Sequence, residues 1–181
     1  MSDPTNDPDA GKAVFRIDIR GTIDDVWTEL VRTDGPQRAM FNTVLHTDGV
    51  APGGQLRMRS LNGRYTGVVG EYLTVERPMR LSHTMRFTNF DDPPATIVYH
   101  LEDLGGSVRV TMTVENIPVG TKSAKQLRQG GPFILKNLKA ILETGKPTLG
   151  ARILYVLFGL LEPLSPASSR SEHWPVDASL R

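Results

Sequence analysis

The sequence predicts an α+β fold in which an antiparallel sheet packs against one long helix. Segments with an apolar residue at every second position recur as far as residue 115, which is typical of half-buried strands. These segments are short and are joined by tight turns, so neighbouring strands should be antiparallel. Residues 121–145 then carry apolar side chains at every third or fourth position, which indicates an amphipathic helix.

Composition excludes several classes of function. The 181 residues are enough for one domain with tails. The 21 Lys and Arg residues nearly balance the 20 Asp and Glu residues, so the charge gives no reason to expect nucleic acid as a partner. Without cysteine, the chain can form no disulfide and no thiolate site. Because the first residues are acidic and lack the apolar stretch of a signal peptide, we expect a cytoplasmic protein.

The N-terminal part predicts a strand followed by short helices. Residues 14–20 alternate apolar and polar side chains, as a half-buried strand does. A short helix should follow as far as Arg32, with Thr22 or Asp24 as its N-cap. Residues 36–41 predict a second helical turn, because proline suits the first position of a helix.

Strand signals then follow in series, each bounded by turn residues. Glycine pairs and a proline mark the turns, since these residues adopt the backbone angles that tight turns require. The predicted strands are residues 43–47, 55–61, 64–75, 81–88, 96–102 and 108–115.

The C-terminal third predicts two helices of different character. The helix at 121–145 contains Pro132, so we expect a kink or break at Gly130-Gly131-Pro132. The next stretch, Leu149–Leu164, is apolar and would be about 20 Å long as a helix, too short for the ~30 Å core of a bilayer. The predicted organisation is a disordered tail at 1–12, one domain at 13–145, an apolar helical extension at 146–164 and a polar tail at 165–181.

Three motifs carry a resemblance to a known family. Residues 52–58, PGGQLRM, look like a glycine turn and the strand after it. Residues 70–81, GEYLTVERPMRL, look like a strand, a proline turn and the start of the next strand, and residues 107–113, SVRVTMT, look like a later strand. In this order and spacing, residues 14–145 resemble the SRPBCC superfamily, and within it the subfamily named after the activator of a heat-shock chaperone ATPase.

The resemblance implies a helix-grip fold, with a curved sheet of about six or seven strands around a long C-terminal helix and a cavity between them. It implies binding of lipids, sterols or polyketides, with catalysis of cyclisation, hydration or ring hydroxylation in a minority of members. It does not imply chaperone activation, because the namesake also depends on a separate N-terminal domain, for which we expect no room here. The family often has tryptophan after the first glycine of the helix, whereas Gly131 and Pro132 stand here. We therefore expect a roomier pocket.

His83 is the strongest candidate for a polar group in the predicted cavity. Strand alternation places it with Met85 on the inward face, where a neutral imidazole could orient a ligand hydroxyl or carbonyl, or act as a general base. A core histidine bonded to a backbone carbonyl or to a tyrosine is the alternative. Tyr99 should also point inward, and its hydroxyl needs a partner in a ligand or in the protein. The residues predicted to line the cavity are Trp27, Met58, His83, Met85, Tyr99, Met112, Phe133 and Leu135.

The sequence favours a binding protein for an apolar or amphipathic small molecule, such as a lipid or a polyketide-like compound. The first alternative is a cyclase, aromatase or hydratase, with His83 as acid or base and Tyr99 as the orienting group. The second is a protein-interaction module that uses the apolar extension. The four histidines lack the spacing of a metal site, and no dinucleotide, phosphate-loop or hydrolase motif occurs, so we expect no metal and no cofactor.

The apolar extension at Leu149–Leu164 has three interpretations. It could lie across the cavity mouth or a flank of the same domain. It could pack against a second subunit and form a homodimer, because an exposed apolar patch of this size is rarely left in water. It could lie on a membrane surface, but Arg152 is its single basic residue, which argues against this interpretation.

Overall fold

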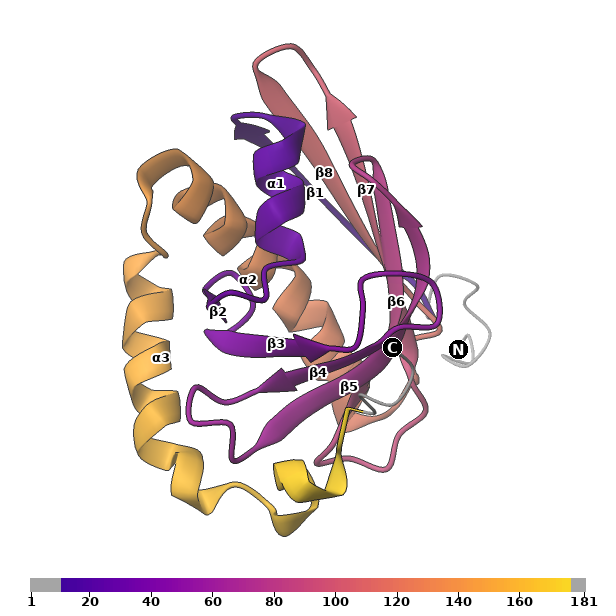
Figure 1. Ribbon diagram of the computed structural model, residues 1–181, viewed down its shortest axis with the longest axis vertical. Helices are drawn as coiled ribbons and strands as arrows, with labels where there is room; N and C mark the ends of the chain where they lie inside the picture. Colours follow the sequence, from indigo (N-terminus) through magenta and orange to yellow (C-terminus); the bar gives the residue numbers. More distant parts are fainter. Residues whose placement is uncertain (1–10, 177–181) are drawn as a thin grey trace, which may run out of the picture.

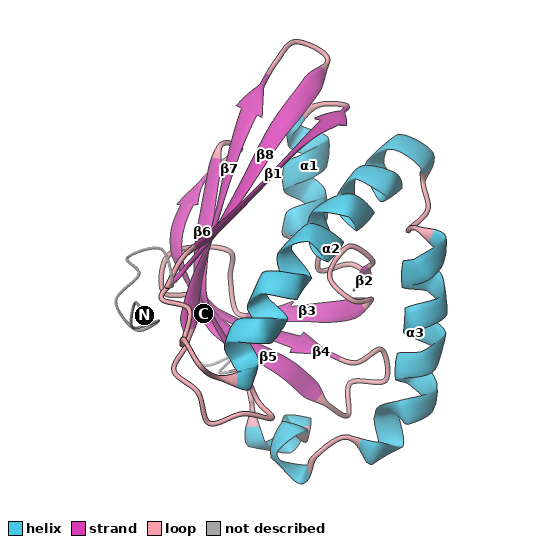
Figure 2. Ribbon diagram, turned by 180° about the vertical axis from the view of Figure 1, so that it is seen from behind, coloured by secondary structure: helices cyan, strands magenta, loops and turns pink. Residues whose placement is uncertain are grey.

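The computed structural model describes residues 11–176. Most of the predicted N-terminal tail, residues 1–10, and the last part of the predicted C-terminal tail, residues 177–181, lie outside the described residues. The described chain forms a curved sheet with α-helices on its concave side (Figures 1 and 2). This is the predicted α+β helix-grip arrangement.

The sheet is antiparallel throughout, and its eight described strands lie in the order β1-β8-β7-β6-β5-β4-β3-β2. Neighbours from β2 to β8 are also consecutive in sequence, whereas the first strand pairs with the last. The strands are β1 (Ala13–Arg20), β2 (Pro36–Gln37), β3 (Thr43–Thr47), β4 (Gln55–Arg59), β5 (Thr66–Glu76), β6 (Arg80–Phe87), β7 (Ala95–Asp103) and β8 (Ser107–Glu115).

The predicted helical turn at 36–41 is wrong. The segment begins instead with the short strand β2, which brings the number of described strands from the seven predicted to eight. Pro36 and Gln37 pair with β3 instead. The buried Gln37 side chain donates from Nε2 to the carbonyl oxygen of Leu30 at 2.9 Å, which fixes this segment against the end of α1. Phe41 and Asn42 have φ values of 57° and 59°, and this left-handed backbone is incompatible with a continuing right-handed helix.

The first helix, α1 (Ile23–Leu30), is capped as the sequence predicts but ends before Arg32. The Thr22 hydroxyl oxygen accepts a hydrogen bond from the Asp25 amide at 3.2 Å, and the Asp25 carboxylate accepts one from the Thr22 amide at 3.3 Å. This reciprocal pair satisfies two amide groups at the start of the helix. The helix then packs Val26 and Leu30 into the core.

The long helix, α2 (Lys122–Thr144), crosses the concave face of the sheet (Figure 2). It continues through Pro132, so the predicted break does not occur. Packing explains this continuity, because the apolar face of the helix is buried along its length and outweighs one missing backbone hydrogen bond. Gly131 lets the helix approach β1, since a Cβ there would lie 2.3 Å from Cε2 of Phe15. Gly145, with φ of 75°, ends the helix.

The apolar extension forms α3 (Leu149–Leu161), which is bent away from α2 by 113°. The buried side chain of Asn137 holds this corner, because its Oδ1 accepts hydrogen bonds from the Thr148 amide at 3.0 Å and the Thr148 hydroxyl at 2.9 Å. Within residues 11–176 no single helix is long and apolar enough to cross a membrane, and α2 and α3 reach that length only as a bent pair.

After α3 the chain returns to the sheet through three short 3₁₀ turns. The first, η1 (Glu162–Leu164), ends the predicted apolar extension, and η2 (Ala167–Ser169) and η3 (Ser171–His173) lie in the polar tail. The Thr88 hydroxyl donates to the Ser169 hydroxyl at 2.9 Å, and the Ser171 amide donates to the carbonyl oxygen of Arg64 at 2.9 Å. These contacts join the tail to the neighbourhood of β5 and β6, so α3 is fixed at both of its ends.

Candidate functional site

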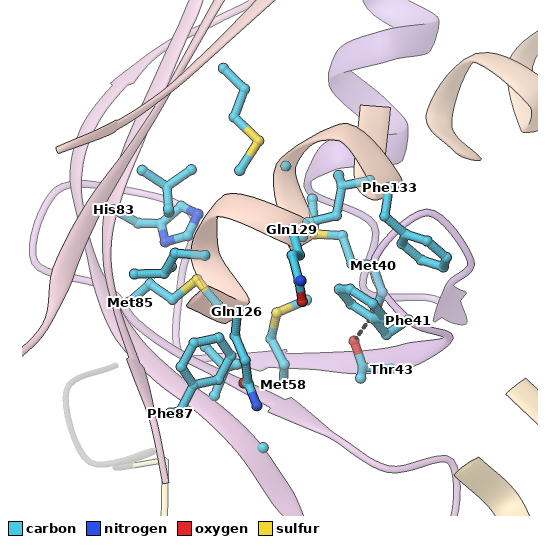
Figure 3. A pocket seen from close by; sticks show the side chains of 18 of the residues that line it. Met40, Phe41, Thr43, Met58, His83, Met85, Phe87, Gln126, Gln129 and Phe133 are labelled. Atoms are coloured by element: carbon cyan, nitrogen blue, oxygen red, sulfur yellow. Dashed lines mark hydrogen bonds between the residues drawn. The ribbon is translucent and has the colours of Figure 1, made fainter. Parts of the chain in front are cut away.

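A cavity of about 450 Å³, here named the inner cavity, lies between the concave face of the sheet and α2 (Figure 3). Strands β4 to β8 contribute its floor and α2 its roof, and the loop before β3 and one residue of α3 lie at its edge. Most of its lining is aliphatic, aromatic or thioether. The side chains drawn and labelled in Figure 3 include Met40, Phe41, Met58, His83, Met85, Phe87 and Phe133.

Strand alternation explains how these side chains reach the cavity. On β6, His83, Met85 and Phe87 lie two residues apart and therefore point to the same face. Tyr99 on β7 and Met112 on β8 are register partners on that face. The sheet thus presents one continuous patch toward α2.

The tautomer of His83 is fixed by the backbone. Its Nδ1 lies 2.9 Å from the carbonyl oxygen of Thr84, and because a carbonyl only accepts, Nδ1 must carry the proton. In the neutral ring Nε2 is then a hydrogen-bond acceptor. Burial lowers the pKa of His83, and the bond to Thr84 opposes this shift only in part. The imidazole is therefore neutral near pH 7.

Two tyrosines flank this imidazole on the neighbouring strands. The ring centre of Tyr99 is 6.4 Å and that of Tyr72 is 6.2 Å from the centre of the His83 ring. Burial raises the pKa of the Tyr99 hydroxyl, and it raises the pKa of Tyr72 to about 12. Both hydroxyls therefore keep their protons and can donate. Within the described residues, no hydrogen bond joins the Tyr99 hydroxyl to a protein group, and Tyr99 lines the inner cavity.

A cluster of aromatic rings forms one edge of the inner cavity. Phe41 stacks on Phe133 with ring centres 4.6 Å apart and planes 8° from parallel. Phe158 of α3 lies 6.4 Å from Phe41, and Tyr155 lies 6.5 Å from Phe133. The Tyr155 hydroxyl donates to the carbonyl oxygen of Arg38. This cluster joins the 38–42 loop, α2 and α3.

The structure places six of the eight predicted lining residues around the inner cavity and two outside it. Trp27 and Leu135 belong to the close-packed core instead. Trp27 is on α1, which packs elsewhere on the sheet, and Leu135 is rotated by about 100° from Ile134, one of the α2 residues that line the cavity. The six that line it are Met58, His83, Met85, Tyr99, Met112 and Phe133.

Sequence reasoning did not single out several lining residues. Phe41 was assigned to a helical turn and Phe158 to a separate extension, and Gln126 and Gln129 were given no role. Helical spacing from Gly130 could have indicated Gln126, four residues earlier. Phe158 could not be found this way, because its position depends on the corner between α2 and α3.

The polar groups limit the chemistry of the inner cavity. Among the described residues that line it, the polar side chains are Thr43, His83, Tyr99, Gln126 and Gln129, with no carboxylate, lysine or arginine. The described residues also hold no group of three or more His, Asp or Glu placed to bind a metal. The arrangement can surround an apolar molecule and offer it an acceptor at His83 Nε2, a donor at the Tyr99 hydroxyl and the side-chain amides of Gln126 and Gln129.

Comparison with known proteins identifies the fold independently. A family model described as "Activator of Hsp90 ATPase homolog 1-like protein" matches residues 20–143. No curated protein is similar enough in sequence to count as a relative. The solved structure of CalU16 from Micromonospora echinospora aligns with a TM-score of 0.59 at 16% identity, over 82% of this chain and 83% of that one.

Two other solved structures align equally well. The Aha1 dimer from Colwellia psychrerythraea gives a TM-score of 0.61 at 18% identity, over 75% of this chain and 98% of that one. DynU16, from the dynemicin biosynthetic locus, gives 0.61 at 20% identity, over 76% of this chain and 49% of that one. At these identities the likeness shows a shared fold.

Proposed function

Since this chain belongs to the Activator of Hsp90 ATPase homolog 1-like family, within the SRPBCC helix-grip superfamily, we propose that it binds an apolar or amphipathic small molecule in the inner cavity. The observation that supports this proposal is a volume of about 450 Å³ lined mainly by apolar side chains. Such dimensions and lining are typical of small-molecule sites. Binding in the cytoplasm stays a prediction.

The polar groups of the inner cavity suit a ligand with a hydroxyl or carbonyl group. The Tyr99 hydroxyl can donate to an oxygen of the ligand, and His83 Nε2 can accept from a hydroxyl. In an apolar cavity an unmade hydrogen bond is costly, so this pair would select among molecules of equal size. A lipid or a polyketide-like compound with one such group fits this description.

Filling the inner cavity tests the proposal. Gly130 lines it, and a Cβ there would lie 3.9 Å from the nearest atom, Cζ of Phe41, so a leucine side chain would enter the open volume. We expect Gly130→Leu to weaken binding of the apolar fluorescent probe N-phenyl-1-naphthylamine by at least tenfold, measured by fluorescence titration. Native mass spectrometry of freshly purified protein should show a co-purified apolar compound in the wild type and less of it in this variant.

Gly150→Leu is the matched control. Gly150 is also a helical glycine with open space around it, but it does not line the inner cavity. This variant should bind the probe as the wild type does. Wild-type protein that fails to bind the probe and carries no compound would refute the proposal.

The outward face of α3 supports a second proposal, that two copies of the chain associate through it. Ile153, Val156, Leu160 and Leu164 lie on one side of this segment with 56% to 79% of their surface exposed. Their spacing of three and four residues gives a continuous apolar stripe that would suit the same stripe on a second copy. The related Aha1 structure from Colwellia psychrerythraea was solved as a dimer.

Sedimentation velocity tests the association. The wild type should be a dimer at micromolar concentration, and Leu160→Glu should be a monomer, because a charge would be placed in the centre of the stripe. Ser168→Glu, on the exposed tail, should leave the dimer intact. A wild type that remains monomeric at every concentration would exclude α3 as a subunit contact.

A further inference from the structure

A second hollow of about 420 Å³, here named the outer chamber, adjoins the inner cavity. The two share lining residues from the 41–43 loop, β5, β6, α2 and α3, including Phe41, Thr43, Gln126 and Phe158. The shared residues, Gly67 and Val68 of β5 among them, lie at the boundary between the two hollows. Thr43 and Gln126 are polar residues at this boundary.

The C-terminal extension and the tail after it contribute part of the lining of the outer chamber. Tyr155, Gly159 and Glu162 line it from α3 and the turn that follows, and Ser165 and Ser169 line it from the tail. All of these residues lie beyond residue 143, where the match to the family model ends. The extension therefore adds a compartment to the cavity that the family domain supplies.

Hydrogen bonds hold the extension against the rest of the domain, so that it can form one wall of the outer chamber. At one end Asn137 bonds to Thr148, and at the other Thr88 bonds to Ser169. Between them the Tyr155 hydroxyl bonds to the carbonyl oxygen of Arg38. These contacts fix the inward side of α3 independently of its apolar outward stripe.

Glu162 contributes a carboxylate to the lining of the outer chamber. One of its carboxylate oxygens, Oε1, is buried and has no hydrogen-bond partner among the described residues. A buried carboxylate oxygen without a partner is unfavourable, and an N–H or O–H donor would relieve this cost. The inner cavity is lined mainly by apolar side chains, so an occupant of both compartments would be mainly apolar there and would carry a donor in the outer chamber.

We propose that the outer chamber and the inner cavity form one binding site for an elongated amphiphile. The apolar chain lies in the inner cavity, and an amine or hydroxyl group at its end donates to Glu162. This inference rests on the proposed function and deepens it by specifying the shape of the ligand and its polar group. Glu162 is then a specificity-determining residue supplied by the extension.

Blocking the outer chamber alone tests whether an elongated ligand extends into it. Gly159 lines the outer chamber but not the inner cavity, and a Cβ there would meet no atom within 4 Å. In isothermal titration calorimetry, Gly159→Leu should weaken hexadecylamine at least tenfold but leave N-phenyl-1-naphthylamine, the probe of the inner cavity, unchanged. Gly150→Leu, in the same helix, should leave both ligands unchanged.

Removing the charge of Glu162 tests the polar group. The wild type should prefer hexadecylamine to hexadecanoate by at least tenfold, and Glu162→Gln should remove most of this preference. Glu172→Gln removes the same charge from an exposed tail residue that lines neither compartment, so it should keep the preference.

The outcomes separate the two proposals. If N-phenyl-1-naphthylamine binds but Gly159→Leu weakens hexadecylamine no more than it weakens this probe, the outer chamber is not part of the site and the proposed function stands. If the wild type shows no preference between hexadecylamine and hexadecanoate, the role of Glu162 is overturned. If neither the probe nor any alkyl ligand binds the wild type, both proposals fail.

Discussion

Gly70→Ala is expected to lower the free energy of unfolding by about 3 kcal/mol, at the upper end of the usual cost of over-packing. A Cβ at this position would lie 2.0 Å from the carbonyl oxygen of Thr84 and 2.9 Å from its carbonyl carbon. Both atoms belong to the backbone of β6, which cannot move away without disturbing the irregular pairing of β5 and β6. Chemical denaturation by urea would measure the loss.

Gly67→Ala is the matched control on the same strand. A Cβ at Gly67 would meet no atom within 4 Å. Alanine restricts the unfolded chain more than glycine does, so this variant should be neutral or more stable by up to about 1 kcal/mol. Equal effects of the two substitutions would show that the approach of β6 to Gly70 is not a tight constraint.

Asn137→Ala is expected to lower the free energy of unfolding by about 1–3 kcal/mol, the usual cost of leaving a buried polar group unsatisfied. The amide of Asn137 accepts from the amide and hydroxyl of Thr148 and donates to the carbonyl oxygen of Phe133 at 2.9 Å. Without it the corner between α2 and α3 loses these three hydrogen bonds and keeps the bond from Arg38 to the carbonyl oxygen of Gly145. Amide hydrogen exchange in α3 should accelerate more than exchange in β7 and β8.

Gln129→Ala serves as the comparison for Asn137→Ala. It removes an exposed amide from the same helix, and Gln129 makes no side-chain hydrogen bond within the described residues. Its effect should stay within about 0.5 kcal/mol. Unchanged exchange in α3 of Asn137→Ala would mean that the contacts of Tyr155 and the tail hold the helix without the corner.

The sequence was sufficient to predict the sheet and its inward face. Alternation along residues 81–88 placed His83 and Met85 toward the helix, and β6 presents them to the inner cavity. This works because side-chain direction in a strand depends on local geometry alone. The Thr22 cap was predictable for the same reason, since both partners lie within one turn.

The features of the fold and of the cavity that the sequence did not predict depend on contacts between distant parts of the chain. Trp27 and Leu135 were predicted to line the cavity, but the rotation of each helix decides which residues do so, and packing sets that rotation. Pro36 and Gln37 form a strand because of their partner β3 and the hydrogen bond of the buried Gln37 side chain. The outer chamber requires the corner at Asn137, which no local pattern indicates.

The pairing of the first strand with the last has a consequence for the order of folding. Every other strand pair joins neighbours in the chain, whereas β1 must wait for β8, the final strand, before it gains its partner. Such long-range closure carries a high entropic cost and raises the contact order, which slows folding. Because α2 packs on β1 through Gly131, the inner cavity is completed late, after the hairpins of β3 to β8 have formed. A nascent chain that has not yet emerged beyond β8 would therefore expose the apolar floor of the site without its roof.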